Sequence, residues 1–68
     1  MPWTPLDSSN LEAYDYDREQ GILHVKFRGG RTYSYRDVPA DVAEGLGTAE
    51  SAGRYFAEMI RERFRPFW

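Results

Sequence analysis

Apolar and polar residues alternate along three segments in the first half of the chain. These segments are residues 11–17, 22–28 and 31–36. An alternation with a period of two places every second side chain on the same face of a β-strand. The connections between the segments are short and contain Gly21 and the pair Gly29-Gly30, residues that are typical of turns. The pattern therefore predicts three consecutive antiparallel strands.

The register of the second hairpin decides which face of the sheet carries Tyr33 and Tyr35. A strict two-residue turn at Gly29-Gly30 places Tyr33 opposite Lys26, on the more basic face. A three-residue loop with a glycine bulge shifts the register by one residue and places Tyr33 opposite Val25. In that register both tyrosines belong to the hydrophobic core.

The first hairpin favours the core-facing register. A four-residue loop at 18–21 places Tyr16 opposite Leu23 and Tyr14 opposite Val25. One face would then collect Tyr14, Tyr16, Leu23, Val25, Phe27, Tyr33 and Tyr35. The other face would collect Asp15, His24, Lys26, Arg28, Thr32, Ser34 and Arg36. Because this division is typical of a sheet that is covered on one side, we expect the three-residue loop.

Two helices are expected after the sheet. In the first, Pro39 suits the first helical position, and Gly45 and Gly47 should weaken and end the helix. Its apolar residues recur every four positions at Val38, Val42 and Leu46. The second helix has the amphipathic pattern of Ala52, Tyr55, Phe56, Met59, Ile60 and Arg63.

The ends of the second helix are also marked in the sequence. Thr48 or Ser51 could cap its start, and Pro66 should stop it. Ion pairs are expected along its polar face, Arg54–Glu58 and Glu58–Arg61. The apolar tail Phe67-Trp68 should dock on the domain or contact a partner.

The predicted fold class is α+β, with a three-stranded antiparallel β-meander followed by two α-helices packed on one sheet face. A chain of 68 residues forms one domain, 1–68, for which we expect a core of 6–64 and terminal extensions at 1–5 and 65–68. Such a small domain has a thin stability margin, and with no cysteine it has no disulfide to reinforce it. Eleven aromatic residues, five Tyr, four Phe and two Trp, supply the bulk of the core.

Positive charge is concentrated in the predicted hairpin although the net charge is −2. Residues 21–36 contain four Lys or Arg residues and no acid, whereas residues 1–20 contain five acids and one arginine. The candidate nucleic-acid-binding residues are His24, Lys26, Arg28, Arg31 and Arg36. The acidic balance of the whole chain weighs against a general nucleic-acid binder, because phosphate attraction usually dominates affinity.

No catalytic or metal-binding arrangement is evident. A Ser-His-Asp set could be drawn from Ser8 or Ser9, His24 and an aspartate, but nothing places an orienting group or an oxyanion site. His24 is the single histidine, and the acids lack metal-ligand spacing, so we expect no metal, no cofactor and no enzyme. Without a long apolar run or a signal-peptide pattern, we expect a cytoplasmic protein with no membrane partner.

Several motifs, taken in order, resemble those of the KTSC domain. They are Ser8-Ser9-Asn10-Leu11, Tyr16-Asp17, Gly21-Ile22-Leu23-His24-Val25-Lys26-Phe27, Gly30-Arg31-Thr32-Tyr33-Ser34-Tyr35, Val38-Pro39, Ala49-x-Ser51-x-Gly53-x-Tyr55-Phe56 and Ile60-Arg61. The resemblance covers roughly residues 6–64. The family is named for the C-terminus of some lysyl-tRNA synthetases and also occurs as small bacterial proteins. Tyr33 and Tyr35 match its central motif, and the resemblance implies a role in RNA binding without known catalytic residues.

Two function hypotheses follow. The first is a small non-enzymatic binding module that contacts RNA or single-stranded nucleic acid through the basic hairpin face. The alternative is a protein-interaction or assembly module that uses a sheet edge and the apolar C-terminal end to bind a protein partner or a host domain.

Overall fold

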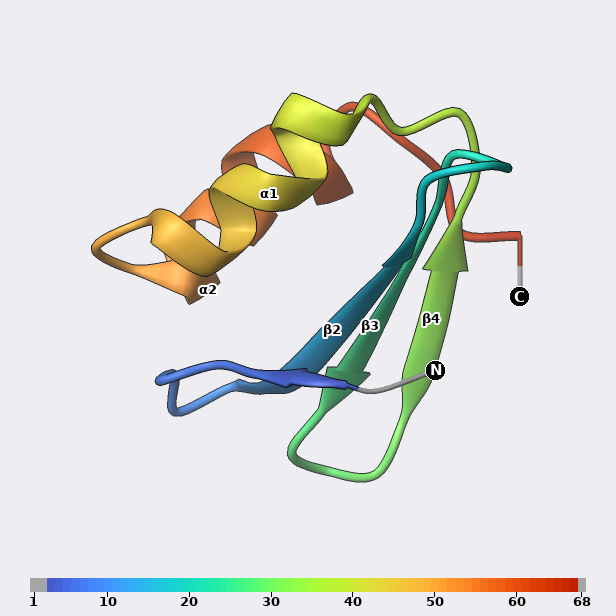
Figure 1. The fold of residues 1–68 in the computed structure, drawn as a ribbon. Coiled ribbons are helices and arrows are strands. Elements are labelled where there is room, and N and C mark those ends of the chain that lie inside the picture. Colours follow the sequence, from blue (N-terminus) through green and yellow to red (C-terminus); the bar gives the residue numbers. More distant parts are fainter. Residues whose placement is uncertain (1–2, 68) are drawn as a thin grey trace.

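The computed structural model describes residues 3–67, which form an antiparallel sheet and a helical layer (Figure 1). The strands are β1 (Thr4–Pro5), β2 (Leu11–Asp17), β3 (Ile22–Phe27) and β4 (Thr32–Tyr35). They lie in the order β1-β2-β3-β4, so each strand pairs with its neighbours in sequence. The helical layer consists of α1 (Ala40–Thr48), α2 (Ala52–Tyr55) and the π-helix η1 (Phe56–Arg61). This α+β order confirms the predicted succession of a meander followed by two helices, the second formed by α2 and η1.

The sheet has one strand more than the three that the sequence predicts. Thr4 and Pro5 of β1 pair with Tyr14 and Ala13 of β2. The pairing continues where the Leu6 N–H donates to the Glu12 carbonyl at 2.9 Å. A strand of two residues is too short to show an alternation, and its proline lacks a backbone donor, so neither residue marks a strand in the sequence.

The observed register is the core-facing one. Tyr33 lies opposite Val25, and Tyr35 lies opposite Leu23. The three-residue loop is closed by the Gly30 N–H, which donates to the Phe27 carbonyl at 2.9 Å. Gly30 has a φ of 98°, a conformation that glycine adopts without steric cost. In the first hairpin, Tyr16 faces Leu23 as predicted.

The first helix continues through both of its glycines, which corrects the expectation that they end it. α1 begins at Ala40, with Pro39 in the N-cap position, and continues through Gly45 and Gly47 to Thr48. A Cβ atom at Gly45 would overlap the Tyr55 hydroxyl, and one at Gly47 would lie 2.6 Å from the Tyr14 hydroxyl oxygen. Both glycines therefore permit a close approach of a tyrosine to the helix, at a modest cost in helix propensity.

The second helix begins at one of its two predicted caps and ends earlier than expected. The Ser51 Oγ accepts a hydrogen bond from the Arg54 N–H at 3.2 Å. The helix then widens into η1, which ends at Arg61, well before Pro66. Pro66 instead lies beside the sheet, in an isolated antiparallel bridge with Tyr35.

The helices cover one face of the sheet and leave the other face without a helical layer (Figure 1). The buried core between the two layers includes Leu6, Leu11, Leu23, Val25, Tyr35, Val38, Ala43, Leu46, Ala52, Phe56 and Ile60. Three edge-to-face ring pairs extend through it, Phe27–Tyr33, Phe27–Phe56 and Tyr35–Phe56. Aromatic packing therefore joins the β3–β4 hairpin to the second helix.

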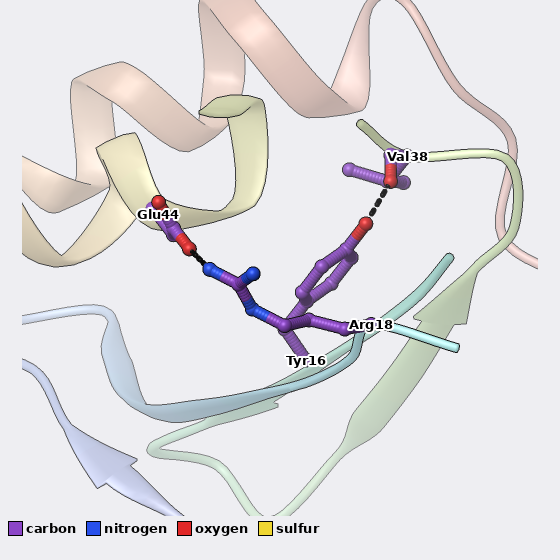
Figure 2. Close-up of polar contacts among 4 residues, drawn as sticks. All are labelled: Tyr16, Arg18, Val38 and Glu44. Carbon is purple, nitrogen blue, oxygen red and sulfur yellow. Dashed lines mark hydrogen bonds and ion pairs between the residues drawn. The ribbon is translucent and has the colours of Figure 1, made fainter. Parts of the chain in front are cut away.

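Two polar contacts join the first hairpin to α1 and to the segment before it (Figure 2). The Tyr16 hydroxyl donates to the Val38 carbonyl at 2.5 Å, and the Arg18 guanidinium pairs with the Glu44 carboxylate. The Val38 N–H also donates to the Gly21 carbonyl at 3.0 Å, so both backbone groups of Val38 are bound by this hairpin. Because Arg18 and Glu44 are solvent-exposed, the buried Val38 contacts are expected to contribute more to stability than the ion pair.

Candidate interaction surface

The sheet face opposite the helices, which we call the open face, carries the polar side chains of the strands. Its polar residues are Asp15, Asp17, His24, Lys26, Thr32 and Ser34, with Arg36 just beyond the end of β4, and Ala13 and Ile22 lie on the same face. The two large hydrophobic residues exposed within residues 3–67 lie beside it, Trp3 (40% exposed) and Phe67 (42% exposed). Each ring lies next to a cation, Trp3 next to Lys26 and Phe67 next to Arg36. The open face is therefore bounded by an aromatic ring at each edge of the sheet.

Lys26 lies on the open face but has partners within the chain. Its Nζ is 3.7 Å from a carboxylate oxygen of Glu12 and 5.7 Å from the centre of the Trp3 ring. An approaching phosphate would compete with both groups. This weakens the electrostatic attraction that nucleic-acid binding needs.

Arg28 takes a structural position at the end of the sheet. Its Nε donates to the Ser8 carbonyl at 2.5 Å, and a terminal nitrogen donates to the Leu6 carbonyl at 3.3 Å. These charge-assisted bonds hold the segment between β1 and β2 against the end of β3. The Arg28 guanidinium is thus directed to the N-terminal segment and not to the open face.

Arg31 and Arg36 are exposed and flank β4. An Arg31 terminal nitrogen is 3.4 Å from the Tyr33 hydroxyl oxygen, which is at the long limit of a hydrogen bond. The Arg36 guanidinium carbon lies 4.5 Å from the centre of the Phe67 ring, a cation–π distance. Of the five candidate residues, these two are the cations least constrained by partners in residues 3–67.

His24 pairs with a serine that was not among the candidate site residues. Its Nδ1 lies 2.6 Å from the Oγ of Ser34, directly across the hairpin, and Asp15 lies opposite His24 on the other side. The serines considered from the sequence, Ser8 and Ser9, are not its partners. The core-facing register places Ser34 opposite His24, so this contact could have been predicted from the register. Ser34 is only 2% exposed, so its hydroxyl is not presented to a substrate.

Tyr33 and Tyr35 pack toward the helices. Tyr35 is 2% exposed, and Tyr33 is partly buried against Phe27. Burial raises the pKa of the Tyr35 hydroxyl, the neighbouring Tyr33 raises it further, and the Arg61 guanidinium partly offsets the rise. With these rings in the core, the open face lacks the stacked tyrosines of an RNA-binding sheet.

The C-terminal segment follows the outer edge of β4. We call residues 65–67 the C-terminal strap; the tail residue Trp68 lies outside the described residues. Pro66 bridges to Tyr35, and the Phe67 N–H donates to the Ser34 carbonyl at 2.9 Å. Figure 1 shows this segment returning from the helices to the side of β4. Of the two alternatives expected for this tail, docking on the domain or contact with a partner, the backbone of Phe67 follows the first, while its ring stays partly exposed.

Strand β2 and the segment around β4 carry opposite charge. β2 contains Glu12, Asp15 and Asp17 and no cation. The segment from Arg31 to Arg36, which includes β4, contains two arginines and no acid. The β4 side is therefore basic and the β2 side acidic, which a whole-chain net charge does not reveal.

A hollow lies in the helical layer, away from the open face. It is a cavity of about 350 Å³, lined in part by Glu50, Arg54, Tyr55 and Glu58. The ion pairs predicted along this helix, Arg54–Glu58 and Glu58–Arg61, are not among the ion pairs of residues 3–67, which are Arg18–Glu44 and Lys26–Glu12. Solvated side chains at such positions gain little from pairing because ordering them costs side-chain entropy.

Two features of residues 3–67 bear on other classes of function. No group of three or more His, Cys, Asp or Glu side chains is arranged to hold a metal ion. None of the described helices combines the length and apolar character that crossing a bilayer requires.

Comparison with known proteins agrees with the fold and the motif order. The KTSC domain family matches residues 7–64. A Tsukamurella paurometabola protein is 44% identical over 61 residues, covering 90% of this chain and 91% of the relative. An uncharacterized protein of Stutzerimonas stutzeri is 40% identical over 68 residues, covering 100% of this chain and 96% of the relative.

A solved structure supports the same assignment. The crystal structure of a KTSC domain protein from Yersinia pestis superposes with a TM-score of 0.90 at 31% identity, covering 96% of this chain and 92% of the other. The family match, the two relatives and this structure together cover both the sheet and the helices. The chain therefore belongs to the KTSC domain family.

Proposed function

We propose that this protein is a small non-enzymatic protein-interaction module that accepts an extended segment of another protein at the edge of β4. The observation that carries the proposal is the C-terminal strap. This short extended segment already pairs with β4 through the Pro66–Tyr35 bridge and the bond from Phe67 to the Ser34 carbonyl. The contact is an intramolecular example of strand addition, a common mode of peptide recognition.

The alternative proposal, RNA or single-stranded nucleic acid on the basic hairpin face, has weaker support. Lys26 is held by Glu12, and Arg28 by backbone carbonyls. The open face also carries Asp15, which would repel phosphate. Protein binding at the edge needs none of these cations to be released, so the geometry favours it.

The proposal can be tested by NMR with an unrelated extended peptide. A neutral seven-residue peptide of alternating Thr and Val with one Phe is titrated into the ¹⁵N-labelled protein. Strand addition should shift the amide signals of residues 32–36 and of Phe67 and leave those of α1 unchanged. The absence of any shift at millimolar peptide would refute the proposal.

The same titration with decauridine separates the two functions. Shifts at Lys26 and Arg28 that disappear as salt is raised would support nucleic-acid binding instead. Shifts at the β4 edge with the peptide alone would support the protein-interaction module.

A further inference from the structure

The edge of β4 and the C-terminal strap form a poorly matched electrostatic pair. The edge is flanked by Arg31 and Arg36, and the strap itself begins with Arg65. In the segment that leads to the strap, Glu62 and Arg63 cancel, so the positive charge of the strap comes from Arg65. A basic segment thus lies beside a basic edge, although like charges in proximity disfavour each other.

The contacts that hold the strap are few within residues 3–67. Its backbone hydrogen bond to β4 is the one from Phe67 to Ser34, and Pro66 has no N–H to donate. The Phe67 ring, 42% exposed, rests on the Arg36 guanidinium at 4.5 Å. Each contact is worth little on its own, so the strap covers the edge weakly.

Along β4, the backbone N–H and C=O groups of successive residues alternately face β3 and the outer edge. This alternation shows which residues can pair with an added strand. The Phe27 N–H donates to the Arg31 carbonyl, so Arg31 directs this group inward, toward β3. Successive residues alternate, and Thr32 and Ser34 therefore direct their backbone groups to the outer edge. The Ser34 carbonyl accepts the hydrogen bond from the Phe67 N–H, which agrees with this alternation.

We propose that the β4 edge binds an extended acidic segment of another protein, which displaces the C-terminal strap. The inference rests on the proposed function of strand addition and names the chemistry of the partner. The incoming backbone pairs with Thr32 and Ser34, its carboxylates lie near Arg31 and Arg36, and an aromatic side chain replaces the Phe67 ring on Arg36. An acidic segment gains the charge complementarity that the strap lacks.

The test compares three peptides of equal length and aromatic content. They are the neutral Thr/Val peptide with one Phe, the same peptide with Glu at every Thr, and the same peptide with Lys at every Thr. In low salt the Glu peptide should bind about tenfold more tightly than the Lys peptide, and the difference should shrink in about 1 M salt as the Debye length falls to about 3 Å. The double substitution Arg31→Glu and Arg36→Glu should reverse this order.

Matched controls separate the edge from the rest of the molecule. Arg54→Glu, on α2, makes half the charge change of that double variant at a site away from the β4 edge, and it should leave the preference for the Glu peptide intact. Phe67→Ala weakens the internal competitor and should raise the affinity for the Glu peptide several-fold. Trp3→Ala removes the other exposed aromatic ring and should leave that affinity unchanged.

The possible outcomes distinguish the preference for an acidic segment from strand addition itself. Equal binding of all three peptides at residues 32–36 keeps strand addition and overturns the acidic preference. An unchanged affinity in Phe67→Ala overturns displacement of the strap. Binding of decauridine without binding of any peptide overturns both proposals.

Discussion

The two edges of the β2–β3–β4 meander are covered by the two ends of the described chain, but the two covering segments are held with different strength. At the N-terminal edge, β1 is joined to β2 by strand pairing and by the bond from Leu6 to Glu12. At the other edge, the C-terminal strap is joined to β4 by a bridge and the bond from Phe67 to Ser34. Both covering segments are short and contain a proline, a residue suited to sheet edges.

The difference lies in the hydrophobic side chain that anchors each covering segment. Leu6, directly after β1, is 7% exposed and belongs to the core, and Arg28 donates to its carbonyl and to that of Ser8. Phe67 instead has a partly exposed ring on an exposed arginine. One edge is therefore closed by a buried anchor, while the other is closed by a contact that a ligand could replace.

The largest effect is expected from removing the anchor of the N-terminal edge. Leu6→Ala should lower the free energy of unfolding by about 2–5 kcal/mol, because it leaves a cavity in a core with little margin. Phe67→Ala should lower it by less than about 1 kcal/mol, since the ring is partly solvated. Urea unfolding followed by circular dichroism measures both.

A milder variant keeps this comparison informative if Leu6→Ala does not fold. Leu6→Val should reduce stability by a smaller amount and still exceed the effect of Phe67→Ala. Equal losses at Leu6 and Phe67 would contradict the distinction between an anchored and a replaceable edge.

Much of this fold could be predicted from the pattern of residues because a regular periodicity applied along most of the strands and helices. The alternation in β3, together with the predicted pairing of Tyr14 and Tyr16 with Val25 and Leu23 in the first hairpin, was enough to choose the register of Tyr33 and Tyr35. The two covering segments could not be predicted in the same way. Two or three residues show no period, and their pairing depends on contacts with residues that are distant in sequence.

Glycine was a reliable signal in the two hairpin turns but not in the first helix. Gly45 and Gly47 looked like helix-ending residues, yet each is required by a tyrosine from another element, Tyr55 and Tyr14 respectively. Among the candidate site residues, the sequence identified the cations but not their partners. The partners of Lys26 and Arg28 are a carboxylate and backbone carbonyls within residues 6–12. These residues lie outside the hairpin, so the sequence pattern of the hairpin does not reveal them.

The arginines at the two edges give a second, smaller contrast. Arg28→Ala should lower the free energy of unfolding by about 1–2 kcal/mol, because the carbonyls of Leu6 and Ser8 lose charge-assisted bonds. Arg36→Ala removes an exposed cation–π contact and should lower it by about 0.5 kcal/mol. Thermal unfolding of both variants provides the measurement.

Arg31→Ala is the control for a general effect of removing positive charge. Its contact with the Tyr33 hydroxyl is long, so stability should change little. A loss as large as that of Arg28→Ala would show that net charge, and not the anchoring of the N-terminal edge, accounts for the result.

The smallest effect concerns the pH dependence of the β4 edge. Burial raises the pKa of Tyr35 above its ordinary value of 10.0, with a further rise from Tyr33. The unfolded chain therefore loses this proton at a lower pH than the folded chain does. The stability contributed by neutral Tyr35 is complete below the ordinary pKa and is lost as pH rises through the folded pKa.

The variant Tyr35→Phe isolates this contribution at the replaceable edge. Urea unfolding at about pH 8 and about pH 11 should show a smaller alkaline loss of stability in Tyr35→Phe than in the unmodified protein. Burial also raises the pKa of Tyr55 in the helical layer, so a residual slope should remain, and Tyr55→Phe should reduce it further. If Tyr35→Phe kept the full slope, the alkaline loss of stability would arise from groups other than Tyr35, and burial of this hydroxyl beside the strap would not contribute to it.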